Sequence, residues 1–308
     1  MRVPDKFKEY IWLVNTIRKS RRITFGEIQR KWLETDMSGG VELARSTFHR
    51  HKDAIEDIFG IYIDCDRSAG FKYFIGNDEV LREDSVQNWM LSTLSVSNQL
   101  SESLSLQSRI LLEPIACHDY LKTVTTAMKR KVRIAVTYRR YGTDRVSHCD
   151  FEPYCIKLFS RRWYVLGHFH RDASAGNPLR DYFGIFSFDR MLSVQLTDVK
   201  FEMDADFDAK AYFGDWWGVM LDEEQPVERI VVRAYGMERF YLTDLPLHHS
   251  QRSVGSGADY EDFELHLRPT DDFCRHLLSH GDCMQVLSPP SLVEHVRKML
   301  HDGLKRYE

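Results

Sequence analysis

The sequence lacks the features that mark membrane-spanning proteins, secreted proteins and small zinc-binding modules. Its 308 residues contain no run of about 18 uninterrupted apolar residues, and the N-terminus has no apolar signal segment. The six cysteines are scattered without a CxxC pair, which is typical of free thiols in a reducing compartment. These absences predict a cytoplasmic protein with no membrane partner.

The sequence also lacks a net positive charge, since the formal net charge of the whole chain is −4 at pH 7. The balance differs along the chain: it is about +3 over residues 1–75, −4 over 76–114, +7 over 115–200 and −10 over 201–308. A basic segment beside an acidic one can attract polyanions locally while the molecule stays soluble. The alternative is that the basic residues form ordinary solvated surface.

The first 77 residues have the element order of a winged helix-turn-helix. Apolar residues at three- and four-residue spacing predict three helices, over residues 6–18, 26–33 and 44–59. Thr24 and Glu27 have the spacing of a capping box at the start of the second helix. Two apolar runs then flank the polar segment 66–70, which predicts a hairpin with a basic tip, as a wing requires.

The third predicted helix holds the candidate DNA-reading surface. The residues expected to face the core are Phe48, Ile55, Ile58 and Phe59. On the opposite side, Arg45, Ser46 and His49 are candidates for contacts to base edges. The candidates for phosphate contacts on this helix and the wing are Arg50, Lys52, Arg67 and Lys72. The predicted partner is double-stranded DNA; a winged helix that serves only protein contacts is the alternative.

The middle of the chain predicts a linker followed by a small β domain. Residues 78–114 combine a helical apolar pattern with an acidic balance, which suits a helical linker. After a helix over 118–130, alternating patterns predict strands over residues 132–138, 146–151, 154–159, 162–169, 183–188 and 191–196. Short strands in this number after one helix indicate a small barrel.

Aromatic and basic residues interleave on two of these strands. The two runs are Arg161-Arg162-Trp163-Tyr164-Val165-Leu166-Gly167 and Phe186-Ser187-Phe188-Asp189-Arg190-Met191. With Tyr138 and Pro153 before them, they resemble the WYL family of bacterial transcription regulators. The resemblance implies an Sm-like barrel that senses a nucleic-acid or nucleotide signal. Gly184 and Ser187 stand where many members carry arginines, which would weaken an anion site built from that strand.

Alternate residues of a strand share a face, so rings and cations of these strands can converge on one ligand. The candidate effector-binding residues are Tyr138, Tyr154, Arg161, Arg162, Tyr164, His168 and Arg190. Trp163 is expected to lie in the core. The effector is expected to be a single-stranded nucleic acid or a nucleotide, and the alternatives are another anion or a purely structural barrel.

The C-terminal third reads as a hinge, 201–227, followed by elements in the order β-α-β-β-α-β-α over 228–308. The WYL resemblance extends here, because this region looks like the family's C-terminal WCX extension, which implies a ferredoxin-like domain that supports dimerisation. The cluster Cys274, His276, His280 and Cys283 does not have the spacing of a common zinc module, so no metal site is predicted.

The sequence therefore predicts a multidomain α+β protein. The expected parts are a winged helix-turn-helix (1–77), a helical linker (78–114), an Sm-like barrel (115–200), a hinge (201–227) and a ferredoxin-like domain (228–308). The expected function is that of a homodimeric, sequence-specific transcription regulator without a cofactor. A nucleic-acid-processing enzyme or accessory factor is the rival, but Asp150, Glu152 and Asp189 form no recognisable catalytic set. A DNA-binding architectural protein that senses nothing is the third possibility.

Overall fold

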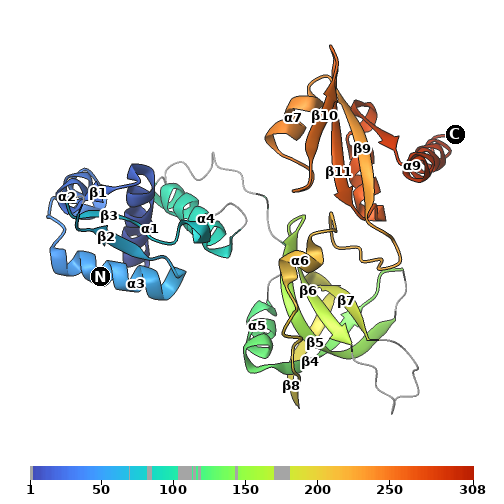
Figure 1. Ribbon diagram of the computed structural model, residues 1–308. Helices are drawn as coiled ribbons and strands as arrows, with labels where there is room; N and C mark the ends of the chain where they lie inside the picture. Colours follow the sequence, from blue (N-terminus) through green and yellow to red (C-terminus); the bar gives the residue numbers. More distant parts are fainter. Residues whose placement is uncertain are drawn as a thin grey trace. The chain divides into compact units, whose positions relative to one another are not determined.

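The computed structural model describes residues 3–68, 70–81, 85–102, 113, 116, 119–142, 145–169 and 181–308, with the backbone alone for 3–5 and 95–102. Two compact units are present, Met1–Leu112 and Glu113–Glu308. Figure 1 colours the first from blue to cyan and the second from green to red. Residues 103–112 of the predicted helical linker, and the start of the helix predicted from residue 118, lie outside the described residues.

The first unit contains the three predicted helices and the predicted hairpin. Its elements are α1 (Val3–Ser20), β1 (Ile23–Thr24), α2 (Phe25–Leu33), α3 (Arg45–Phe59), β2 (Ile63–Asp66), β3 (Lys72–Ile75) and α4 (Val86–Glu102), with 3-10 turns at Asp36–Ser38 and Asp78–Leu81. The predicted capping box of α2 is confirmed, because Thr24 and Glu27 each accept a hydrogen bond from the other's backbone N–H. The strand β1 was not predicted; it pairs with β3 in a sheet of order β1-β3-β2.

One buried ring of helix α3 packs against both α2 and β3. Phe48 is fully buried, and its ring centroid lies 5.2 Å from that of Phe25 in α2 and 4.7 Å from that of Tyr73 in β3. Ile55 and Phe59 are buried as expected. The expectation for Ile58 is wrong: its side chain is 42% exposed, so the core covers a narrower stripe of this helix than its apolar pattern suggested.

The second unit begins with a helix and five antiparallel strands. They are α5 (Leu121–Arg130), β4 (Val132–Arg139), β5 (Val146–Phe159), β6 (Arg162–Phe169), β7 (Tyr182–Ser187) and β8 (Met191–Lys200), paired in the order β7-β6-β5-β4-β8. The two strands predicted over 146–159 are one strand. Pro153 lies at a register shift against β6, so the chain bends there without breaking the strand.

Gly167 in β6 is required by close packing in this sheet. A Cβ atom at this position would lie 2.3 Å from Cδ2 of Phe151, whose ring is buried in the core of the β domain. Only a residue without a side chain leaves room for that ring.

The C-terminal part contains the seven predicted elements in the predicted order. They are β9 (Glu228–Tyr235), α7 (Glu238–Asp244), β10 (Arg252–Ser256), β11 (Tyr260–Leu267), α8 (Asp271–Ser279), β12 (Met284–Ser288) and α9 (Pro290–Leu304). The sheet order is β10-β11-β9-β12. Alternate residues of β9 and β11, such as Val232 and Leu265, are buried in one core with Phe273 of α8 and Leu292 of α9.

The predicted hinge contains the short helix α6 (Ala209–Phe213), and its C-terminal part is held by both β5 and α8. Lys157 Nζ of β5 donates a 2.7 Å hydrogen bond to the Gly218 carbonyl, and Asp272 of α8 accepts hydrogen bonds from the two backbone N–H groups that follow. Between them, the Trp217 ring packs edge-on against Phe159 and stacks on His276. Burial lowers the pKa of Lys157 to about 8.

Candidate nucleic-acid interface and effector site

The start of α3 is both accessible and positively charged. The side chains of Arg45, Ser46, His49 and Arg50 are exposed, and Lys52 is half-buried. From Arg45 to Lys52 the helix has no acidic residue, whereas acidic residues follow from Asp53 onward. This half of the helix can therefore approach a polyanion without like-charge repulsion.

The backbone at the same end of α3 adds to this charge. Ala44 occupies the N-cap and provides no side-chain hydrogen bond, and alanine is a poor capping residue. The first N–H groups of a 15-residue helix are thus left for an outside acceptor at the positive end of its dipole. A phosphate group is a suitable acceptor.

Several of the basic side chains are oriented by neighbouring groups. The guanidinium of Arg45 lies 5.1 Å from the Phe25 ring centroid, and Lys52 Nζ lies 5.8 Å from that of Tyr73. Arg50 donates a 3.1 Å hydrogen bond to Oγ1 of Thr47, one turn earlier. These contacts leave the charges at the surface, where they remain available.

The two remaining DNA-binding candidates lie on the hairpin β2–β3. Arg67 is exposed in the turn after β2, and Lys72 is half-buried as the first residue of β3. Ala69, in the same turn, lies outside the described residues. Lys52 of α3 lies over the ring of Tyr73, and Lys72 is the residue before Tyr73 in β3. The helix and the hairpin therefore each carry a lysine close to this ring.

His51 is a polar residue of α3 that the sequence did not single out. Its Nε2 lies 3.1 Å from Oε2 of Glu9 in α1, both side chains are less than a tenth exposed, and the Tyr10 ring packs edge-on against the imidazole. Burial lowers the pKa of His51, so the imidazole favours the neutral form. His51 therefore anchors α3 to α1 and is not part of the reading surface.

In the β domain, rings and cations meet beside the end of β7. The guanidinium of Arg190 lies 4.6 Å from the Tyr138 ring centroid and 4.1 Å from that of Tyr141, which is 58% exposed. Arg162 Nε lies 3.7 Å from Oδ2 of Asp189. We call this set, with Tyr164, the ring–arginine cluster.

Three properties suit the ring–arginine cluster to binding an anion and a base. Arg162 is 44% exposed, and the side chains of Tyr164 and Arg190 are half-buried. Burial raises the pKa of Tyr164, so its hydroxyl stays protonated and can donate a hydrogen bond. Arg162 and Tyr164 alternate along β6 and share one face, while Trp163 on the other face packs against the core, as expected.

Two of the predicted effector residues lie elsewhere. Tyr154 is only 6% exposed and is enclosed by Phe183, Phe201 and Phe207, while its hydroxyl accepts a hydrogen bond from the Asp204 N–H. His168 packs on the same ring, with Nδ1 3.1 Å from Oε2 of the buried Glu152. The expectation that they line an open face is corrected, because the hinge segment supplies the rings that cover them.

Tyr138 and Arg161 also differ from the expectation. Tyr138 is 6% exposed, so its ring supports Arg190 from below and presents no open face for stacking. Arg161 is exposed in the turn between β5 and β6, where it pairs with Glu113 at 3.1 Å. The partners of Arg161 among the described residues, Glu113 and the Ala116 N–H, lie outside the ring–arginine cluster.

The positions that depart from the family pattern have structural roles here. Ser187 is 3% exposed, and its N–H donates a 3.2 Å hydrogen bond to the Tyr138 hydroxyl. A Cβ atom on Gly184 would lie 3.1 Å from the Phe169 ring and 3.2 Å from that of Phe186. Ser187 is enclosed, and a side chain at Gly184 would press against two rings, so Arg162 and Arg190 are the cations of the cluster.

The two histidines of the cysteine–histidine cluster in the C-terminal part, His276 and His280, face each other. His276 Nε2 and His280 Nε2 are 3.4 Å apart, and His280 Nδ1 lies 2.9 Å from Oε1 of Glu238. Cys274 is buried and contacts the Pro269 carbonyl. Within the described part of the chain, no three His, Cys, Asp or Glu side chains are placed to share a metal ion. Nor does any helix there combine the length and apolar character needed to cross a membrane.

Comparison with known proteins identifies two domains in the second unit. The model of the WYL domain family matches residues 119–196, and that of the WCX domain family matches residues 226–304. No curated protein sequence matches this chain.

Two solved structures are similar to this chain, over different shares of its length. One is the proteasome accessory factor B/C (PafBC) of Arthrobacter aurescens, at 18% identity and a TM-score of 0.36, covering 95% of this chain and 45% of that one. The other is described as a CRISPR Cas-related protein, at 10% identity and a TM-score of 0.33, covering 60% of this chain and 50% of that one. This chain thus spans about half the length of each.

Proposed function

We propose that this protein, which contains a WYL domain and a WCX domain, is a DNA-binding transcription regulator whose WYL domain senses a nucleic-acid or nucleotide effector. The observation that carries the proposal is the ring–arginine cluster of the WYL domain, present in one chain with the basic, uncapped start of α3. The first is suited to a base and its phosphate, and the second to duplex DNA.

The element order of the first unit supports a winged helix-turn-helix, with α3 as recognition helix and the β2–β3 hairpin as wing. In the second unit, the order β7-β6-β5-β4-β8 after one helix supports an Sm-like barrel. The order β-α-β-β-α-β in one antiparallel sheet supports a ferredoxin-like WCX domain.

Regulation requires that the effector bind unequally to two arrangements of the protein. We propose a homodimer in which the two winged helix-turn-helix units, the heads (residues 1–77 of each chain), contact the half-sites of a palindromic operator, so that the effector acts by changing their spacing. An effector with equal affinity for the DNA-competent and the incompetent arrangement would change nothing. Either repression or activation is compatible with this scheme.

The acidic residues of the WYL domain favour a regulator over an enzyme. Glu152 is 1% exposed and is paired with both Arg133 and His168, which makes it part of the fold. Asp150 is exposed on β5, and Asp189 is paired with Arg162. These three carboxylates have different neighbours and do not converge on one reacting position.

The test uses the full-length protein and an operator found by mapping its bound sites in the genome. Nucleic acid or nucleotide that copurifies with the protein identifies the effector, whose effect on operator affinity is then measured by fluorescence anisotropy. We expect Arg162→Ala to abolish the effector response while operator affinity without effector is retained.

Arg161→Ala is the matched control, because it removes the same charge from the neighbouring residue outside the ring–arginine cluster. It should leave the effector response intact. A normal response in a folded Arg162→Ala protein would refute the sensing role. Failure of the wild-type protein to bind any DNA site specifically would refute the regulator.

A further inference from the structure

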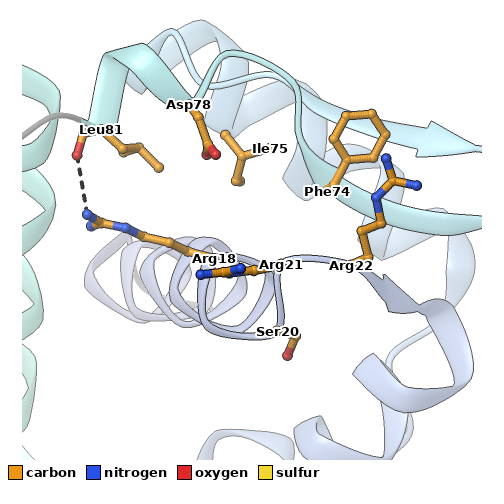
Figure 2. Close-up of a pocket in the computed structure, with 8 residues that line it drawn as sticks. All are labelled: Arg18, Ser20, Arg21, Arg22, Phe74, Ile75, Asp78 and Leu81. Atoms are coloured by element: carbon orange, nitrogen blue, oxygen red, sulfur yellow. Dashed lines mark hydrogen bonds between the residues drawn. The ribbon is translucent and has the colours of Figure 1, made fainter.

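A cavity of about 780 Å³ lies in the first unit, at the end of α1. Figure 2 shows the residues around it, which come from the end of α1, the turn that follows, β3 and the 3-10 turn after it. The lining residues are Arg18, Ser20, Arg21, Arg22, Phe74, Ile75, Asp78 and Leu81. None of them belongs to the predicted DNA-reading or effector-binding sets.

The lining of this cavity is cationic, because it contains three arginines and one carboxylate, Asp78. Arg18 donates hydrogen bonds to the Leu81 carbonyl and to Oδ1 of Asn88, which holds its guanidinium at the cavity wall. Arg22 is paired with Asp66 at 2.6 Å. Among the residues that the structure describes, Arg21 forms no ion pair and no side-chain hydrogen bond.

The backbone that carries Arg21 is unusual for an arginine. Its φ of 57° lies in the left-handed region, which costs a residue with a side chain about 1 kcal/mol relative to glycine. The turn is closed by hydrogen bonds from the N–H groups of Arg21 and Arg22 to the carbonyls of Arg18 and Ser20. Two carbonyls at the end of α1 are thereby occupied, which reduces their repulsion of an anion.

The start of α4 lies on the other side of Arg18. Ser85 caps this helix, since Asn88 N–H donates a 3.0 Å hydrogen bond to Oγ of Ser85. Asn88, in the first turn of α4, is also the partner of Arg18. The positive end of the α4 dipole thus adds to the charge of the arginines.

An aromatic ring borders the same cavity. Phe74 is half-buried, and Figure 2 shows its ring beside the Arg22 guanidinium, which is 5.3 Å from the ring centroid. Its neighbours in β3, Tyr73 and Ile75, are buried in the core, so Phe74 faces the opposite side of the strand. Because the Arg22 guanidinium lies over one face of the ring, a base would stack on the opposite face while the arginines bind its phosphates.

We propose that this cavity is a second, independent nucleotide site, in which Arg18 and Arg21 bind the phosphate groups and Phe74 stacks the base. Its size is within the range of small-ligand pockets. The site joins the end of α1 to the start of α4 through Arg18, so a bound nucleotide would contact the segment that leads out of the head. This inference stands apart from the proposed effector site in the WYL domain.

The test measures binding of ADP to the full-length protein by isothermal titration calorimetry, in a chain that carries Arg162→Ala to weaken binding at the ring–arginine cluster. We expect one saturable site that Arg21→Gly weakens by about 10- to 100-fold, as expected for a lost charge-assisted hydrogen bond. Glycine adopts a positive φ without strain, so this variant should fold. Lys19→Ala, which removes an exposed charge two residues away that does not line the cavity, should change affinity less than about twofold.

The base and phosphate parts of the site are separated by a second pair of measurements. Phe74→Leu should weaken ADP by about tenfold and leave inorganic pyrophosphate unchanged. Absence of saturable ADP binding in the Arg162→Ala chain, or ADP binding that is indifferent to Arg21→Gly, would overturn the proposal. The proposal is also overturned if Arg21→Gly instead lowers the salt dependence of operator binding, because the phosphate then comes from the DNA backbone.

Discussion

The salt dependence of DNA binding offers a quantitative test of the head. Four side chains in each head are expected to contact phosphates: Arg50, Lys52, Arg67 and Lys72. Since each neutralised phosphate contributes about −0.9 to the slope of log affinity against log salt, four contacts per head give about −3.6, and two heads about −7. Replacing Arg50 by alanine in a homodimer should reduce the magnitude of the slope by about 1.8.

Arg50 is the best choice because the fold depends on it little. Its side chain is exposed and donates a hydrogen bond to Thr47 on the same helix. Any loss of binding in Arg50→Ala should therefore reflect the phosphate contact. The weakening should be similar for all sequences, whereas a base-side variant such as Arg45→Ala should mainly relax the preference at one base pair, by about 1–3 kcal/mol.

The assay is fluorescence anisotropy of a labelled operator at salt concentrations from 50 to about 200 mM. Lys298→Ala, which removes one exposed positive charge from α9 in the WCX domain, is the matched control and should leave the slope unchanged. If Arg50→Ala has the wild-type slope, the start of α3 does not face the phosphates. The assignment of α3 as recognition helix would then be wrong.

Three further predictions concern packing, capping and a buried charge. Gly167→Ala should destabilise the WYL domain by about 1–3 kcal/mol in thermal unfolding, because the added methyl overlaps the Phe151 ring; an unchanged Tm would refute the close packing. Thr24→Ala should cost the head about 1 kcal/mol through loss of the capping box, whereas Thr24→Ser should preserve it, as urea unfolding would show. Burial lowers the pKa of Lys157 from 10.5 to about 8 in the folded protein. Between pH 8 and 10.5 the unfolded chain therefore binds more protons at this lysine than the folded protein does, so the free energy of unfolding should rise with pH over that range. Lys157→Met should lack this increase, and identical pH profiles for the two proteins would contradict a buried, charged Lys157.

Local patterns predicted most of the elements correctly. The capping box at Thr24 and the helical spacing before it depend on residues three or four positions apart, so the sequence contains everything needed to find them. The alternation in β6 likewise separated Trp163 from Arg162 and Tyr164. The prediction of two strands over 146–159 failed because proline can stand at a bulge within one continuous strand.

Burial of polar and aromatic residues was harder to predict, because it depends on distant partners. His51 is inside because Glu9, in another helix, provides a hydrogen-bond partner for it. Tyr154 and His168 lie on strands rich in rings and basic groups, as a binding face would, yet Phe201 and Phe207 of the hinge pack with Tyr154 in a buried cluster. No spacing within β5 or β6 contains that information.

The sequence by itself determined the order of the elements, the division between basic and acidic segments, and the strands that carry the rings and arginines, since these follow from short-range periodicity and composition. Only the tertiary structure decided which of those side chains are accessible. It joined Arg162 and Arg190 with Tyr138 and Tyr141, and it brought Arg18, Arg21 and Phe74 around one cavity. The physical reason is that a binding site requires side chains from separate elements to meet in space, and their meeting is fixed by the packing of buried rings such as Phe48 and Phe151.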